Sequence, residues 1–221
     1  MRFPNAHNGV KKIFTAEILS LIGTIALIIA AILALAAGTM ISNGTADAEV
    51  NATVGMAAGL ALFGIAGSIL MLIAFIMNLV GIISAKKDEE SFKTALIFVF
   101  VGIAASLLSG IFSKNALVGD FTRIITNFAE MLVAYYVVHG IMNLAQRLQD
   151  AEMVKRGNQV RMYLIVAYCI PILIHLISTL LSINTDSVLS EGLDLFASVV
   201  SLVVYVIYLG YLRKAKNMLE K

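Results

Sequence analysis

Tryptophan is absent from this 221-residue chain, which contains one cysteine, two prolines and three histidines. The single cysteine, Cys169, excludes an internal disulfide and any metal site built from several cysteines. The histidines are scattered over positions 7, 139 and 175, so the sequence predicts neither a metal centre nor a bound cofactor. Without tryptophan, anchoring at a membrane surface would depend on tyrosine and phenylalanine.

Charge is also scarce, since charged residues make up 14% of the chain and hydrophobic residues 60%. Soluble domains usually carry about 25% charged residues, so this composition is typical of a membrane protein. The formal net charge of +2 leaves no basic surface of the kind that binds nucleic acid. The mean hydropathy of +0.92 agrees with an integral membrane protein whose principal partner is the lipid bilayer.

Recognisable catalytic motifs are missing as well. The chain has no His-Glu-x-x-His zinc motif and no Gly-x-Ser-x-Gly nucleophile elbow. It has no P-loop, so any dependence on ATP would require a separate ATPase subunit. The sequence therefore predicts a protein that is not an enzyme.

Long apolar segments dominate what is present. Crossing about 30 Å of hydrocarbon takes about 20 helical residues, and six segments are long enough. They lack the strict alternation of barrel strands, so we expect helices, because lipid requires every backbone group to be bonded internally. The predicted fold is all-α: a polytopic six-transmembrane-helix bundle forming one membrane domain over residues 1–221. The spans are expected at about residues 13–39, 54–85, 94–112, 121–145, 162–182 and 192–212.

Basic residues predict the orientation of these spans. All but two of the 16 lysines and arginines lie in the N-terminus, the second and fourth loops, or the C-terminal tail. The exceptions, Lys114 and Arg123, flank the third loop. By the positive-inside rule, both termini and these two loops are cytoplasmic in a plasma-membrane protein. A signal peptide is the rival interpretation of the N-terminus, but its apolar run is longer than the usual 7–15 residues.

A weak repeat links three of the segments. The second, fourth and sixth each end with an apolar run, a glycine (Gly81, Gly140 or Gly210), two apolar residues and a basic exit. This pattern predicts three tandem helical hairpins. Chance is the alternative, because apolar segments with basic exits resemble one another by default.

The fourth segment carries the most unusual residues, Glu130 and His139, which lie about 900° or half a turn apart on a helix. Ionisable groups inside a membrane are costly and therefore mark candidate functional sites. Glu130 and His175 are expected at a similar depth below the outer surface, where they could bind a proton or cation. The predicted intramembrane polar site is Glu130, His175, Asp194, Arg123 and Ser198. Helix-to-helix bonding is the structural alternative.

A second polar pair is predicted nearer the cytoplasm, between Glu17 and His139. Glu17 could equally extend to the interface and meet basic residues there. Asn78 is expected to form a hydrogen bond between helices. The acidic triplet from Asp88 to Glu90 sits among lysines in a short loop, and we interpret it as a solvated turn.

Packing signals complete the pattern. Gly102, Ser106 and Gly110 form a small-residue stripe that allows close helix approach, either within the bundle or in a homo-oligomer. Pro171 is expected to bend the fifth helix near His175, for packing or for transport.

Three functions fit these patterns. The leading hypothesis is a transport-related protein: a small permease, a channel subunit or a membrane substrate-binding component. The second is a non-catalytic accessory, scaffold or immunity-type membrane protein whose polar residues only hold helices together. The third is an intramembrane enzyme. The predicted partners of the protein are a second copy of the chain or a separate membrane or ATPase subunit.

Overall fold

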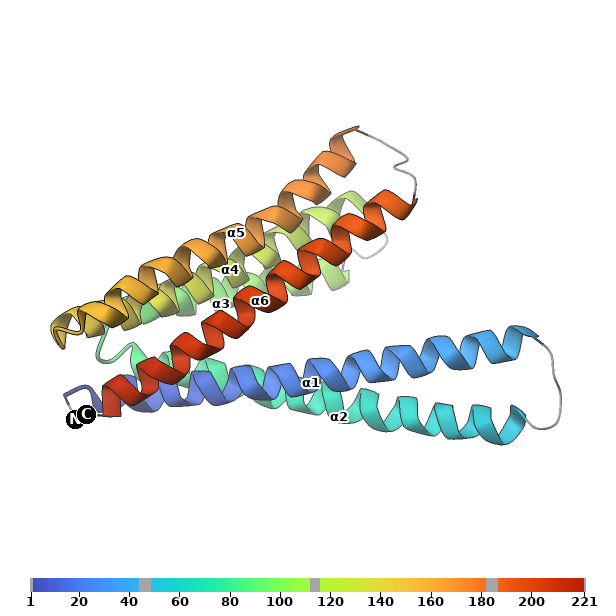
Figure 1. The fold of residues 1–221 in the computed structure, drawn as a ribbon, viewed down its shortest axis with the longest axis horizontal. Coiled ribbons are helices and arrows are strands. Elements are labelled where there is room, and N and C mark those ends of the chain that lie inside the picture. The colour runs from blue at the N-terminus through green and yellow to red at the C-terminus, as the bar shows by residue number, and fades with distance from the viewer. Residues whose placement is uncertain (1, 44–48, 112–115, 182–186, 221) are drawn as a thin grey trace. The chain divides into compact units, whose positions relative to one another are not determined.

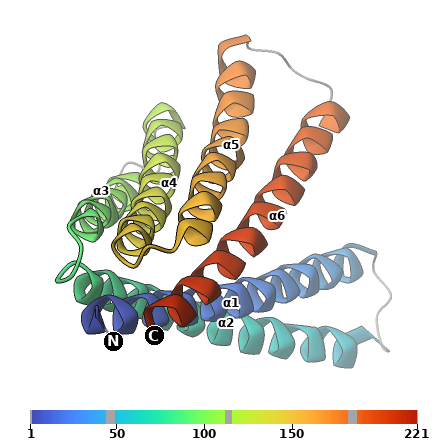
Figure 2. The same cartoon turned by 60° about the vertical axis from the view of Figure 1, so that its left-hand side comes forward.

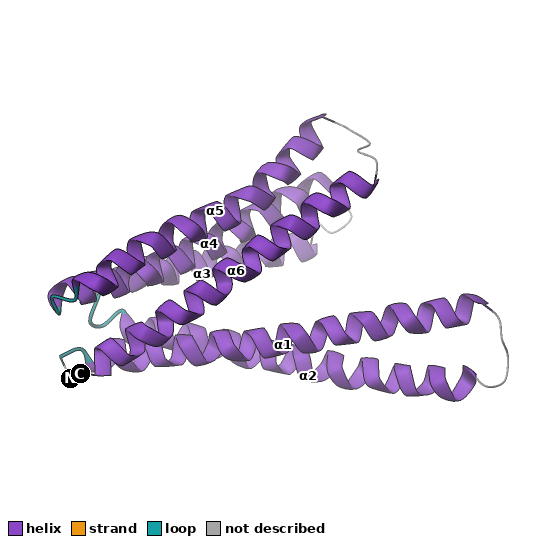
Figure 3. Cartoon of the chain, viewed as in Figure 1, coloured by secondary structure: helices purple, strands orange, loops and turns teal. Residues whose placement is uncertain are grey.

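The chain folds into long helices, as the computed structural model shows (Figure 3). Its description covers the backbone of residues 2–43, 49–111, 116–181 and 187–220, with side chains except at 37–43, 49–57, 116–120, 123, 171, 172, 174–181 and 187–198. The helices are α1 (Pro4–Asn43), α2 (Glu49–Ala85), α3 (Ser91–Ile111), α4 (Ala116–Arg147), α5 (Ala151–Leu181) and α6 (Ser187–Glu220). Over these residues there is no strand, so the all-α prediction is confirmed.

Each predicted segment coincides with a helix, and most of the helices extend beyond the apolar run. The first two helices contain 40 and 37 residues. At 1.5 Å per residue, α1 is about 60 Å long and α2 about 55 Å, close to twice the hydrocarbon thickness. Because helix formation is local, polar flanks simply continue the helices that the apolar runs begin.

Four stretches are long and apolar enough to cross a membrane. They are Pro4–Ala36, Ala58–Ala85, Ser91–Ile111 and Ile124–Arg147. Many side chains of α5 and α6 lie outside the described residues, so a six-span count stays a prediction. The membrane character of the chain rests on these four helices.

The structure divides into two compact units that share the helices α1 and α2. One unit comprises Lys12–Asn78, which contains α1 from Lys12 onward and α2 as far as Asn78. Within it the two helices approach closely where Gly23 meets Gly67: a Cβ on either glycine would stand 3.0–3.1 Å from the carbonyl oxygen of the other. Such contacts are typical of small residues between membrane helices. Most large apolar side chains of this unit are exposed, as expected for surfaces that face lipid.

The other unit comprises Met1–Lys11 and Leu79–Lys221. Here α3 packs on α4, α4 on α5 and α5 on α6, an order that Figures 1 and 2 both show. The start of α1 packs on the end of α2, where a Cβ at Gly9 would stand 2.5 Å from the Gly81 carbonyl oxygen. The core of this unit contains large buried side chains from several helices, such as Phe92, Ile141 and Leu212.

The three repeated glycines have different surroundings. Gly81 presents its carbonyl to Gly9, and Gly140 lies against the ring of Phe92, 2.7 Å from where its Cβ would be. A Cβ at Gly210 would meet nothing within 4 Å. The shared sequence pattern therefore does not correspond to a shared packing contact.

Candidate functional site

Glu130 lies within the candidate span Ile124–Arg147 of α4, and its side chain is exposed. No hydrogen bond or ion pair joins it to any described residue. Its neighbour Ala129 is buried against α3, 3.6 Å from the Cβ position of Gly102. Successive helical residues point about 100° apart, so Glu130 is directed away from that contact. A carboxyl group inside a candidate span, with no bond to a described residue, remains the strongest single candidate for function.

The other members of the predicted polar site lie outside the described side chains. His175 belongs to α5, Asp194 and Ser198 to α6, and Arg123 to α4. The pairing of Glu130 with His175 thus stays a prediction. The helix α5 continues through Pro171, and the bend expected there also stays a prediction.

The second predicted pair has other partners in the structure. The Asn78 amide Nδ2 donates to Glu17 Oε1 at 3.1 Å, which confirms the interhelical bond expected of Asn78. His139 Nδ1 lies 3.0 Å from Arg161 Nη1. Glu17 and His139 belong to different units, and their direct contact stays a prediction.

The small-residue stripe on α3 is only partly used among the described residues. Gly102 contacts Ala129 of α4, whereas a Cβ on Gly110 would meet nothing within 4 Å, and Ser106 is exposed. The outer part of the stripe therefore has no close neighbour among the described residues, and its part in a homo-oligomer stays a prediction.

The loop between α2 and α3 forms the best-defined polar cluster. The Asp88 carboxylate accepts hydrogen bonds from the Ala6 backbone N at 2.7 Å and from Asn5 Nδ2 at 3.0 Å. These donors lie in the first turn of α1, where backbone N–H groups lack helical partners. Phe3, which precedes the helix, has no polar side chain to cap it, so Asp88 supplies the cap from another part of the chain.

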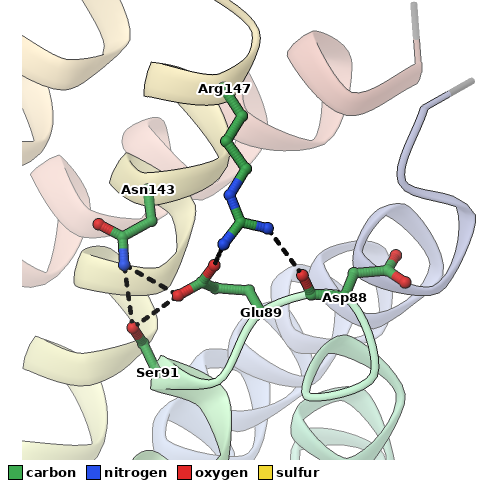
Figure 4. A network of polar contacts seen from close by, with 5 residues as sticks. All are labelled: Asp88, Glu89, Ser91, Asn143 and Arg147. Atoms are coloured by element: carbon green, nitrogen blue, oxygen red, sulfur yellow. Dashed lines mark hydrogen bonds and ion pairs between the residues drawn. The ribbon is translucent and has the colours of Figure 1, made fainter.

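The next residue, Glu89, is 6% exposed and joins the loop to α4 (Figure 4). Its Oε2 pairs with Arg147 Nη2 at 2.7 Å. Its Oε1 accepts hydrogen bonds from Asn143 Nδ2 at 2.9 Å and from Ser91 Oγ at 3.0 Å. Arg147 Nη1 also donates to the Asp88 carbonyl oxygen at 3.2 Å.

These contacts determine the charge state of Glu89. Burial by itself would raise the pKa of the Glu89 carboxyl. The hydrogen bonds from Asn143 and Ser91 and the charge of Arg147 outweigh burial, so the pKa lies below its usual value. Glu89 is therefore held as a carboxylate.

The interpretation of this loop as a solvated turn is wrong for Asp88 and Glu89. Both side chains reach donors that are more than 50 residues away in sequence. One sequence signal could have indicated the contact: Asn143 and Arg147 are four residues apart, on one face at the end of α4. By the predicted topology, this end of α4 and the acidic loop lie on the same side of the membrane.

A second cluster surrounds Arg161. Its guanidinium lies 4.9 Å from the centre of the Tyr135 ring, and the rings of Tyr135 and His139 stack with their centres 6.3 Å apart. Tyr135 and His139 share one face of α4, as their spacing of four residues predicts. Their contact with Arg161 was not foreseen.

In the described part of the chain, no three histidine, cysteine, aspartate or glutamate residues lie close enough together to hold a metal ion. The chain matches no protein-family model, no curated protein and no solved structure. Its chemistry must therefore be argued from its own residues.

Proposed function

We propose that this protein is a transport-related component of the plasma membrane, in which Glu130 binds a proton or a cation. In this proposal all six helices cross the bilayer and both termini are cytoplasmic. The single observation that supports it is the Glu130 carboxyl in the candidate span Ile124–Arg147, which bonds to none of the residues whose side chains are described. The described carboxylates Glu17, Asp88 and Glu89 all accept hydrogen bonds from neighbouring helices or loops.

The chemistry of an intramembrane carboxyl group supports this role. An unpaired charge in hydrocarbon costs several kcal/mol, so the group favours its neutral, protonated form or a bound cation. Exchange between these states is what moving a proton or cation across a membrane requires. His175 and Asp194 are the proposed neighbours on α5 and α6.

Flux measurements test the proposal. The full chain would be reconstituted in liposomes with a pH-sensitive dye inside, and proton and potassium gradients imposed in turn. We expect a flux that Glu130→Gln abolishes, because glutamine keeps the size but cannot ionise. Glu152→Gln is the matched control: Glu152 is exposed and, among the described residues, pairs only with Arg156 one turn along α5. Equal flux from both variants, or no flux from the wild type, would contradict the proposal.

A second candidate function is a non-catalytic accessory or scaffold protein. It is favoured by the contacts of Asp88 and Glu89, which bind the start of α1 and the end of α4 to one short loop. Polar residues used in this way stabilise a fold. In that case Glu130→Gln would leave flux at the background level, and substitutions of the polar residues would lower only the stability of the bundle.

A further inference from the structure

Arg161 of α5 is held by neutral groups. Its Nη1 lies 3.0 Å from His139 Nδ1, its Nη2 donates to Asn158 Oδ1 at 3.3 Å, and its guanidinium faces the Tyr135 ring. Because arginine has only donors, His139 Nδ1 must be the acceptor, and the imidazole is neutral with its proton on Nε2. None of these three contacts supplies negative charge.

No carboxylate of the described residues bonds to Arg161, although its side chain is half-buried. Two acidic residues act electrostatically on this cluster, Glu89 on His139 and Asp150 on Tyr211. Both are engaged elsewhere: Glu89 pairs with Arg147, and Asp150 accepts from the backbone N–H of Met153. A partly buried cation is costly without an anion in direct contact, and Arg161 has none among the described residues.

Two buried donors near Arg161 have no partner. The Nε of Arg161 and the hydroxyl of Tyr211 are both closed to solvent and form no hydrogen bond. Tyr211 is 3% exposed, and its hydroxyl lies 2.7 Å from where the Cβ of Gly157 would stand, one turn of α5 before Arg161. Arg161 also acts electrostatically on Tyr211. Buried donors normally form hydrogen bonds, so two unpaired donors on facing parts of α5 and α6 indicate that an acceptor is missing between them.

We propose that Arg161 and Tyr211 bind a phosphate group, carried by an anionic lipid headgroup or by a soluble phosphate. The planar guanidinium fits phosphate oxygens, and the phenol adds a further donor. Arg161 immediately precedes the predicted fifth span, which places it at the level of the headgroups. Basic sites between membrane helices on the cytoplasmic side are suited to such headgroups. This site is separate from Glu130 and does not depend on the proposed transport.

Thermal unfolding of the purified full chain in detergent tests this site. In one arm the midpoint with phosphatidylglycerol is compared with the midpoint with phosphatidylcholine. In the other arm the midpoint with inorganic phosphate is compared with the midpoint with sodium chloride at equal ionic strength. A ligand that binds only the folded state raises the midpoint in proportion to the logarithm of its concentration. A rise with phosphatidylglycerol alone identifies a lipid site, and a rise with inorganic phosphate identifies a soluble anion. No rise in either arm overturns the proposal.

Matched variants separate this site from general attraction to basic residues. Arg161→Gln should weaken binding about tenfold or more, because it removes a charged hydrogen-bond donor. Arg156→Gln, on the same helix but paired with Glu152, should bind like the wild type. Equal weakening in both variants would overturn the proposal.

Tyr211→Phe provides a variant that is expected to fold. Its hydroxyl has no partner, so removing it should leave the ligand-free midpoint unchanged while weakening binding several-fold, about what one hydrogen bond contributes. Binding as tight as in the wild type would exclude Tyr211 from the site.

Discussion

At the scale of single residues, the structure contains two glutamates in opposite situations. Glu89 is buried, ionised and bonded by three side chains, whereas Glu130 is exposed at membrane depth and has no partner among the described residues. A buried carboxylate needs hydrogen bonds or an ion pair, and Glu89 has two hydrogen bonds on Oε1 and the ion pair with Arg147 on Oε2. Glu89 is therefore a structural residue, and Glu130 remains the candidate for function.

Replacing Glu89 should destabilise the unit that contains it. In Glu89→Gln the charge is lost, and Arg147 and Asn143 lose their anionic acceptor. We expect a loss of about 1–2 kcal/mol, with the share of Arg147 reduced because its side chain is 53% exposed. Thermal unfolding in detergent measures the change. Glu90→Gln is the control, since that side chain is exposed in the same loop, and an equal loss there would contradict the assignment.

The stabilisation by Glu89 should also depend on pH. A carboxyl whose pKa is lower in the folded state stabilises the fold fully above its unfolded pKa, about 4.5. That stabilisation disappears as the pH falls through the lower pKa of the folded state, because the neutral acid no longer attracts Arg147. The difference in unfolding midpoint between the wild type and Glu89→Gln should thus be constant near pH 7 and vanish under acid. A difference that grows toward low pH would refute this account.

At the scale of the elements, α4 ends in a turn whose hydrogen bonds are complete but whose backbone is strained at Gln149. Asp150 N donates to the Ala145 carbonyl and Gln149 N to the Gln146 carbonyl, the two bonds of a Schellman motif. The residue at its turn, Gln149, has a φ of 58°, a conformation that favours glycine. This turn separates α4 from α5, which then begins with Asp150 as its cap.

Gln149→Gly should therefore stabilise the protein by about 1 kcal/mol, because glycine adopts positive φ without a Cβ clash. The matched control is Gln159→Gly, an exposed position inside α5, where glycine should cost about 1 kcal/mol. Unfolding midpoints of the two variants should move in opposite directions. Two shifts of the same sign would contradict the assignment of strain to Gln149.

The pair α1 and α2 offers a second element-scale prediction. A Cβ on Gly67 would stand 2.9 Å from Leu27 Cγ and 3.0 Å from the Gly23 carbonyl oxygen, while one on Gly64 would meet nothing within 4 Å. Gly67→Ala should lower stability by about 1–3 kcal/mol through overpacking, and Gly64→Ala should not. Thermal unfolding of the two variants checks this contrast, and equal effects would show that the helices do not approach at Gly67.

At the scale of the whole molecule, the distribution of basic residues predicts the topology, and the structure adds that several chain segments meet. Within one unit, Asp88 joins the start of α1 to the α2–α3 loop, and Arg147 joins that loop to the end of α4. The start of α1, the α2–α3 loop and the end of α4 therefore lie close together, as the predicted topology requires of segments on one side of the bilayer. Which side they face stays a prediction.

Cysteine labelling tests the side. Lys87→Cys in the α2–α3 loop and Lys155→Cys in α5 are exposed positions in basic segments. An impermeant maleimide should label neither in intact cells and both in inside-out vesicles, in a Cys169→Ser background. Labelling of either position from outside would reverse the predicted orientation.

By itself, the sequence determined the class of structure and the positions of the helices. Hydropathy over some 20 residues suffices for this, because lipid leaves the backbone no partners except those within a helix. The spacing of Tyr135 and His139 likewise predicted a shared helix face, since that depends only on the helical period. The sequence also singled out Glu130, because an ionisable residue inside an apolar segment is costly.

Only the tertiary structure decided which polar groups meet. Asp88 reaches α1, Glu89 reaches Asn143 and Arg147, and His139 reaches Arg161. These contacts depend on how helices rotate and pack against one another, which no short window of sequence specifies. For that reason an apparently solvated loop is a buried junction, while the acid in the apolar segment bonds to none of the described residues.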